Sequence, residues 1–205
     1  MPNYNGVWSL STQYQYAADW PRLSITGLFH LGFTNADVNT IDQINTVSEG
    51  NATDFGDRTV TKDRSGACAS ATRGVFAGGH TNTDVIDFVT IATAGNATDF
   101  GNLIAATARL EGNSSSTRGI FSGGYTDARD DTIQYITIAS AGNATDFGNL
   151  VATSTSHAAC GSTTRGLFGG GNTDSGVIDS IQYITFASVG NTTDFGNLIA
   201  TTSRH

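Results

Sequence analysis

Apolar and polar residues alternate in four short stretches of the chain, which follow one another at similar distances. The stretches cover residues 41–47, 86–92, 133–138 and 181–186. Within each, isoleucine or another apolar residue alternates with Thr, Gln or Asp. A period of two is that of a β-strand with one buried face. Each stretch is therefore predicted to form a half-buried strand.

A second apolar stretch precedes each alternating one and ends in glycine. Three copies, at 72–79, 117–124 and 164–171, begin with Thr-Arg-Gly and end with Gly-Gly, whereas the copy at 26–32 lacks the arginine and the second glycine. Glycine permits positive φ and close approach of another backbone. We expect a short strand here whose end lies against another part of the chain.

A seven-residue phrase, Gly-Asn-Ala-Thr-Asp-Phe-Gly, follows each alternating stretch, at 50–56, 95–101, 142–148 and 190–196. The only change among its copies is Thr192 for alanine. We expect the phrase to form a turn. A third strand is predicted after it, for example at 102–107, and a fourth in the small-residue stretches 66–70 and 158–162. Four short strands in about 46 residues correspond to one blade of a β-propeller.

The unit made by these elements resembles the Kelch repeat: a strand, Gly-Gly, an aromatic-bearing strand, and a strand closing on arginine. The amino-acid sequence at 164–171, 181–185 and 190–198 is similar to Kelch-like repeats in virion proteins of marine tailed bacteriophages. The opening, 4–10 and 19–21, also resembles the N-termini of such phage structural proteins. The unit departs from Kelch in lacking the usual Trp after the aromatic strand. The phenylalanines of the phrase are expected to take that packing role: Phe55, Phe100, Phe147 and Phe195.

The resemblance implies an all-β fold, a small β-propeller of about four Kelch-like four-stranded blades. Residues 1–21 form an N-terminal anchoring or strap segment, and 22–205 form the repeat domain. Its units are expected at about 22–64, 65–109, 110–156 and 157–205. The sequence leaves open whether one chain closes the ring, two copies share it, or an N-terminal strand completes a blade, since open strand edges invite association.

Two repeated residue sets are candidates for chemistry. The aspartates of the phrase are 45, 47 and 48 residues apart: Asp54, Asp99, Asp146 and Asp194. A ring of carboxylates suits calcium, but the spacing is unlike a calcium loop, and capping of the turn is the favoured interpretation. The arginines of the second set are Arg73, Arg118 and Arg165. They suit an anionic ligand such as a sugar acid, but the favoured interpretation is a bond to a carbonyl or carboxylate of the neighbouring blade.

Composition narrows the function classes. The 205 residues include 18 Asp and Glu against 10 Lys and Arg, a net charge of −8 without a basic cluster, so no nucleic-acid partner is expected. No apolar run of some 18 residues and no signal-like N-terminus are seen, so neither membrane insertion nor secretion is expected. The two cysteines, Cys68 and Cys160, are expected to be free and mostly buried.

The histidines share no repeat position, a Gly-X-Ser-X-Gly elbow is absent, and only two glutamates are present. We therefore expect no catalytic, metal or cofactor site, and no enzyme. The resemblance implies a non-enzymatic structural component of a phage virion, in the tail, a fibre or the capsid surface. It would bind other virion proteins and form a homo-oligomer. The expected docking residues are all aromatic: Trp8, Tyr14, Tyr16, Trp20 and Tyr125. The alternative is a module that recognises a host surface glycan.

Overall fold

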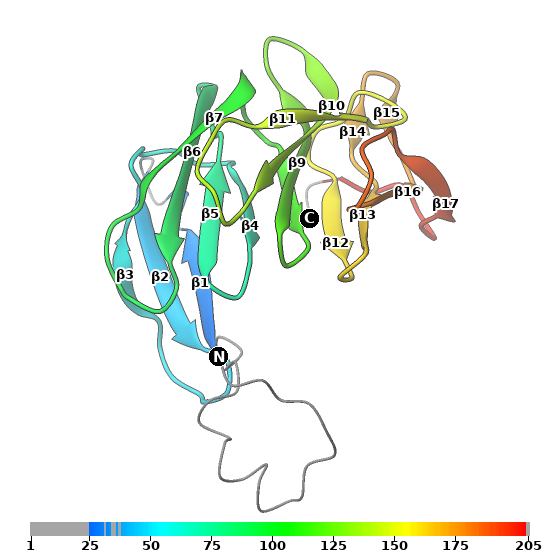
Figure 1. The fold of residues 1–205 in the computed structure, drawn as a ribbon. Coiled ribbons are helices and arrows are strands. Elements are labelled where there is room, and N and C mark those ends of the chain that lie inside the picture. The colour runs from blue at the N-terminus through cyan, green and yellow to red at the C-terminus, as the bar shows by residue number, and fades with distance from the viewer. Residues whose placement is uncertain (1–24, 31, 34–35, 37, 204–205) are drawn as a thin grey trace, which may run out of the picture.

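The structure is a computed structural model in which residues 25–30, 32–33, 36 and 38–203 are described. Every regular element in this part of the chain is a β-strand, and the strands form antiparallel sheets (Figure 1). The all-β fold with several four-stranded sheets, predicted from the alternating pattern, is confirmed. No described helix has the length and apolar character needed to cross a bilayer.

Four sheets follow one another along the chain, and we call them units 1 to 4. Unit 1 contains β1 (Thr26–His30), β2 (Thr40–Asn45) and β3 (Thr53–Asp57). Unit 2 contains β4 (Gly66–Ala69), β5 (Arg73–Ala77), β6 (Thr83–Thr90) and β7 (Thr98–Thr107). Unit 3 contains β8 (Glu111–Ser114), β9 (Arg118–Tyr125), β10 (Arg129–Thr137) and β11 (Thr145–Asn149).

Unit 4 contains β12 (Ala158–Gly161), β13 (Arg165–Gly169), β16 (Ser180–Thr185) and β17 (Thr193–Asn197). A small hairpin, β14 (Asn172–Thr173) and β15 (Gly176–Val177), lies between β13 and β16. In every unit the strands pair in chain order, each antiparallel to the next. The short strand β8 contacts its counterparts in both neighbouring units, β4 and β12. Figure 1 shows the units side by side in chain order, with β3 and β17 at opposite ends of the row.

The core lies between the units, because both faces of an inner sheet are apolar. One cluster joins Ile41 and Phe55 of unit 1 to Phe76, Val89 and Ala97 of unit 2. Two further clusters join unit 2 to unit 3 and unit 3 to unit 4 in the same way. Each unit therefore buries its apolar surface only against its neighbours, as in other repeat proteins.

The repeated phrase does more than form the expected turn. Its Thr-Asp-Phe-Gly half begins the outer strands β3, β7, β11 and β17. These residues enter the strand because they pair with the preceding strand across a bulge that recurs in all four units, for example between Ile41 and Asp42. β-branched Thr and aromatic Phe also suit a strand. The first half of the phrase remains outside the strands.

Candidate functional site

The first half of each later phrase binds the outer strand of the preceding unit. We call the contact between consecutive units a joint, numbered 1 to 3 along the chain. At joint 1 the N–H of Gly95 donates to the carbonyl of Phe55 (2.7 Å), and the N–H of Ala97 donates to that of Asp57 (2.8 Å). In return the N–H of Asp57 donates to Oδ1 of Asn96 (3.1 Å). The phrase is therefore the connector between units.

Joints 2 and 3 repeat these three hydrogen bonds. The backbone pairs are Gly142 to Phe100, Ala144 to Asn102, Gly190 to Phe147 and Thr192 to Asn149, at 2.7 to 2.9 Å. The N–H groups of Asn102 and Asn149 donate to Oδ1 of Asn143 and Asn191, both at 3.0 Å. The asparagine of the phrase thus acts across the joint, at a partner about 40 positions away in sequence.

The second glycine of the phrase is required by this contact. A Cβ added to Gly56, Gly101 or Gly148 would lie 2.4 to 2.5 Å from a carbonyl oxygen of the next unit. The φ angles of these glycines, 145° to 147°, are also ones that other residues rarely adopt. The repeated glycine is therefore explained by the approach of two backbones.

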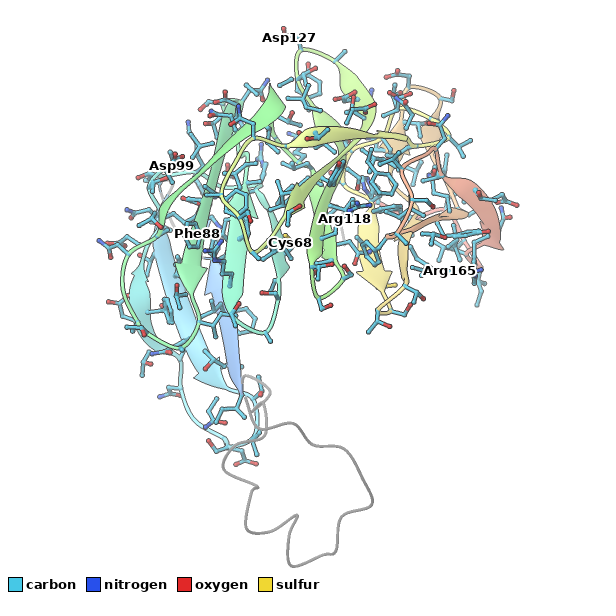
Figure 2. All side chains as sticks on the ribbon, viewed as in Figure 1. Cys68, Phe88, Asp99, Arg118, Asp127 and Arg165 are labelled. Atoms are coloured by element: carbon cyan, nitrogen blue, oxygen red, sulfur yellow. The ribbon has the colours of Figure 1, made fainter. Side chains whose placement is uncertain are left out.

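The repeated arginines also lie across the joints. The guanidinium of Arg73 stacks on Phe88 of its own unit (4.4 Å) and donates from Nη1 to the carbonyl of Ile138 in the next (2.9 Å). Arg118 stacks on Tyr135 and donates to the carbonyl of Phe186. Arg165, in the last unit, stacks on Tyr183 (4.6 Å) and is exposed. Figure 2 shows Arg118 and Arg165 on neighbouring units.

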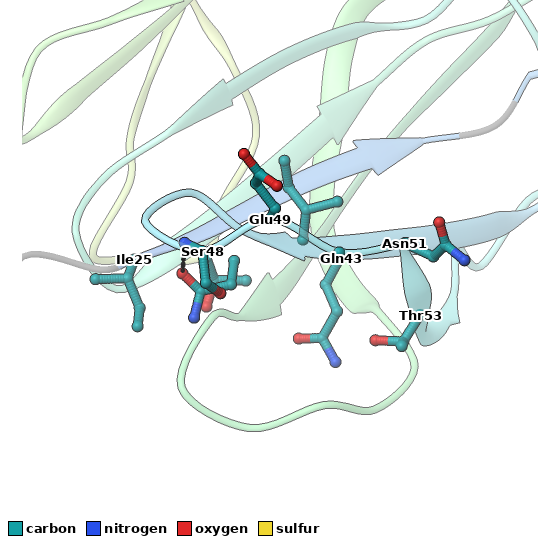
Figure 3. A pocket seen from close by; sticks show the side chains of 10 residues that line it. Ile25, Gln43, Ser48, Glu49, Asn51 and Thr53 are labelled. Atoms are coloured by element: carbon teal, nitrogen blue, oxygen red, sulfur yellow. Dashed lines mark hydrogen bonds between the residues drawn. The ribbon is translucent and has the colours of Figure 1, made fainter.

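Unit 1 lacks this arginine–aromatic stack, since Thr26 stands at the repeat position of the arginine and Gln43 at that of the aromatic residue. A hollow of about 380 Å³ lies there, lined also by Ser48, Glu49 and Asn51 (Figure 3). Its lining is mixed: polar side chains with one carboxylate, and two apolar side chains, Ile25 and Ile44. Small side chains in place of the stack account for the hollow.

Joint 1 contains a buried ion pair that the sequence analysis missed. Nε of Arg58 lies 3.0 Å from Oδ1 of Asp87, and neither side chain is exposed. The same carboxylate accepts the N–H of Thr59 (2.9 Å). Burial lowers the pKa of Arg58, and the charge and hydrogen bonds of Asp87 partly offset this effect.

Joints 2 and 3 use a neutral combination at these positions. Leucines Leu103 and Leu150 stand where unit 1 has Arg58, and Gln134 and Gln182 stand where unit 2 has Asp87. The glutamine Oε1 atoms accept the N–H of Ile104 and of Val151, both at 2.8 Å. Between repeats these two positions change together, from Arg and Asp to Leu and Gln. This covariation is the sequence signal that indicates a contact between Arg58 and Asp87.

The four aspartates of the phrase lie on the outer strands of four different units and are exposed. Asp54 accepts the N–H of Gly56 (3.1 Å). They are not brought together. In the described ranges, no three His, Cys, Asp or Glu side chains are grouped so that they could hold a metal ion.

Two serine–histidine contacts lie inside the joints. Oγ of Ser122 is 3.0 Å from Nε2 of His157 at joint 3, and both residues are buried. At joint 1 the two residue types exchange repeat positions, and His30 Nδ1 lies 3.3 Å from Ser65 Oγ. Burial, and secondarily the charge of Arg58, lower the pKa of His30 to about 4. The Ser122–His157 contact is buried and the His30–Ser65 contact is part-buried, and both connect side chains of consecutive units.

One open hollow combines an aromatic ring with charged side chains. It has a volume of about 730 Å³ and lies between the loops that follow β5 and β9. Its lining is mixed in charge and polarity: His80, Thr81, Asn82, Ala108, Arg109, Tyr125 and Asp127. Of the predicted docking residues, only Tyr125 lies in the described part of the chain; Trp8, Tyr14, Tyr16 and Trp20 lie outside it. Tyr125 is 42% exposed at this hollow.

Backbone contacts across joint 2 fix the Tyr125 hollow. Tyr125 and Ala108 exchange two backbone hydrogen bonds (2.7 and 2.9 Å), and the side-chain amide of Asn82 donates to the carbonyl of Thr126. Thr81 and Asn82 have positive φ, 61° and 43°. Such angles cost about 1 kcal/mol or more per residue and are found where surrounding structure holds them. Figure 2 shows Asp127 at the tip of the hairpin between β9 and β10.

The cysteines are both free, with Cys68 buried and Cys160 exposed. Burial raises the pKa of the Cys68 thiol to about 12. Exposure of Cys160 corrects the expectation of burial at its position: β12 belongs to the last unit, so no further small-residue strand covers it from the far side.

Comparison with known proteins gives no family whose model matches the chain, and no similar curated protein is found.

Proposed function

We propose that the protein is a rigid, non-enzymatic interaction scaffold and a structural component of a phage virion, whose units are Kelch-like propeller blades. The observation that carries the proposal is the repeated joint. Its three connecting hydrogen bonds recur in each of the three joints with nearly constant lengths. Such repetition supports a stiff body that positions its loops, and the loops are free to contact partners.

The virion assignment is tested on purified particles. Phage particles are isolated from infected cells that express the chain, and the chain is quantified by mass spectrometry and located by antibody labelling in the electron microscope. We expect a fixed number of copies per particle at one place, in the tail, a fibre or the capsid surface. Presence of the chain in the infected lysate but not in washed particles would contradict the assignment.

A second candidate function, recognition of a host surface glycan, is favoured by the Tyr125 hollow. An exposed aromatic ring beside Arg109, His80 and Asp127 offers a stacking face together with groups that bind hydroxyls or an acidic sugar. Its test is saturation-transfer NMR with neutral and acidic surface oligosaccharides. Tyr125→Ala should abolish transfer, and Tyr125→Phe should keep most of it. Val177→Ala, at an exposed position of β15, is the control. Equal transfer in all three variants would contradict a site at Tyr125.

A further inference from the structure

The two ends of the row of units carry opposite halves of the joint. The face of unit 4 that points away from unit 3 is called the tail face, and is made by Leu167, Ile181, Phe195 and Leu198. Phe195 is 53% exposed, whereas Phe55, Phe100 and Phe147 at the same repeat position are 2 to 3% exposed. The other three residues are partly exposed, and their counterparts in units 2 and 3 are buried. The tail face is thus half of a joint core.

The face of unit 1 that points away from unit 2 carries the other half. This head face is made by Phe29, Ile44, Asn51 and Ala52. Phe29 is 54% exposed, although its counterparts Phe76, Phe121 and Phe168 are at most 3% exposed. Ala52 is exposed, and its counterpart Ala97 is buried against Phe55.

The connecting hydrogen bonds are also divided between the two faces. Gly50, Asn51 and Ala52 are the counterparts of the residues that bind the preceding outer strand at every joint. On unit 4, Phe195 and Asn197 are the counterparts of the residues whose carbonyl groups accept these hydrogen bonds. A Cβ placed on Gly196 would meet nothing within 4 Å, whereas at the other three joint glycines it would meet the next backbone.

We infer that the tail face of one copy binds the head face of a second copy, and so continues the row of units across a fourth joint. The inference goes beyond the scaffold role and does not depend on the virion assignment. A second copy is the occupant because three examples of the same interface already exist inside the chain. Unit 1 and unit 4 of one chain lie at opposite ends of the row (Figure 1), so each face meets its complement on another molecule.

The internal joints specify the contacts of this fourth joint. The N–H of Gly50 donates to the carbonyl of Phe195 of the other copy, and the N–H of Ala52 to that of Asn197. The N–H of Asn197 donates to the side chain of Asn51. The Phe195 ring packs on Ala52 as Phe55 does on Ala97. Arg165, exposed in the single chain, reaches the backbone of Thr46, the counterpart of Ile138 and Phe186.

One position makes the fourth joint weaker than the internal ones. Asp42 stands at the position of Asp87, but Leu198 stands at that of Arg58. The internal joints combine Asp with Arg or Gln with Leu, and never Asp with Leu. The carboxylate of Asp42 therefore receives no guanidinium at the fourth joint. Association is reversible for this reason, and either Leu198→Arg or Asp42→Gln restores a combination found inside the chain.

A head-to-tail contact produces a closed ring when its rotation closes, and an open polymer when it does not. The test is the mass of the full-length chain by sedimentation velocity over a range of concentrations. We expect mass to rise with concentration, to a discrete ring or a growing series. Leu198→Arg and Asp42→Gln should each shift the transition to at least several-fold lower concentration. A wild-type chain that stays monomeric up to its solubility limit, and variants that do the same, would overturn the inference.

Mixing two blocked variants tests the polarity of the contact. Ala52→Asp places a charge in the head face, and Phe195→Asp places one in the tail face; each alone should be monomeric. An equimolar mixture should form heterodimers, because each variant retains one intact face. Val177→Asp carries the same added charge away from both faces and should associate as wild type does, and so should Ala52→Thr, which copies Thr192.

The mixture also separates misfolding from blocked association. Heterodimers show that both blocked variants are folded. If Phe195→Asp has lost its circular dichroism spectrum, Leu198→Asp replaces it as the tail variant. Folded variants that do not associate on mixing, beside a wild type that does, would show that like faces meet and that the head-to-tail inference is wrong.

Discussion

Arg58 and Asp87, 29 positions apart in sequence, form an ion pair of 3.0 Å that is completely buried between units 1 and 2. Two nitrogen atoms of the guanidinium, Nη1 and Nη2, have no hydrogen-bond partner there. The Phe76 ring, whose centroid lies 5.6 Å from the guanidinium carbon, provides a cation–π contact. The attraction between the two charges stabilises the joint, but the loss of water from Nη1 and Nη2 of Arg58 is not offset by hydrogen bonds.

The first prediction concerns this pair. Arg58→Leu alone leaves a buried carboxylate without its cation, and should lower the free energy of unfolding by roughly 3–5 kcal/mol. The double change Arg58→Leu and Asp87→Gln copies joints 2 and 3, and should be close to neutral or stabilising. Urea unfolding of the three proteins measures the difference. A double variant as unstable as the single one would show that the Leu–Gln combination does not transfer to joint 1.

The second prediction concerns the glycine of the connector. Gly101→Ala would place a Cβ 2.5 Å from the carbonyl oxygen of Gly142, at a φ of 145°. We expect destabilisation of about 1–3 kcal/mol, measured by thermal or urea unfolding. Gly142→Ala is the matched control, because a Cβ there meets nothing within 4 Å. Equal losses in the two variants would argue against the close approach as the cause.

The third prediction compares two arginines at one repeat position. Arg118→Ala removes a stack of 4.4 Å on Tyr135 and the bond to Phe186 in the next unit, and should cost about 1–2 kcal/mol. Arg165→Ala removes only a stack in the exposed last unit and should cost less in the monomer. Urea unfolding at low protein concentration gives both values. An equal or larger loss for Arg165→Ala would contradict the importance of the contact between units.

The fourth prediction is a pH dependence. Burial raises the pKa of Glu111 from its ordinary 4.5 to about 7. The folded state therefore holds this proton more tightly than the unfolded state, so the contribution to stability is complete below about pH 4.5. It is lost as pH rises through 7, by up to roughly 3 kcal/mol. Glu111→Gln should flatten this part of the stability curve, and Glu49→Gln, at an exposed position, should leave it unchanged.

The strands were predictable because their signal is local. The alternation around Ile86 and the glycines after Phe76 are visible within eight residues. The role of Asn96 was not predictable, because its partner is the backbone of Asp57, 39 positions earlier. An asparagine at this position would also be expected if it only capped a local turn. For the same reason no local pattern marks Arg58 as the partner of Asp87, which lies 29 positions later in the sequence. The aromatic Tyr125 was recognised from its loop, whereas the hollow around it needed the approach of a second loop, at Thr81 and Asn82.

The position of the apolar clusters has a consequence for synthesis on the ribosome. Because Phe55 is covered by Ala97, and Phe100 by unit 3, a newly made unit has no shelter for its apolar side until the following one has emerged. Ordering should advance along the nascent chain one step behind translation. Ribosome-bound chains arrested after units 2, 3 and 4 should therefore show protection from protease in units 1, 2 and 3 respectively.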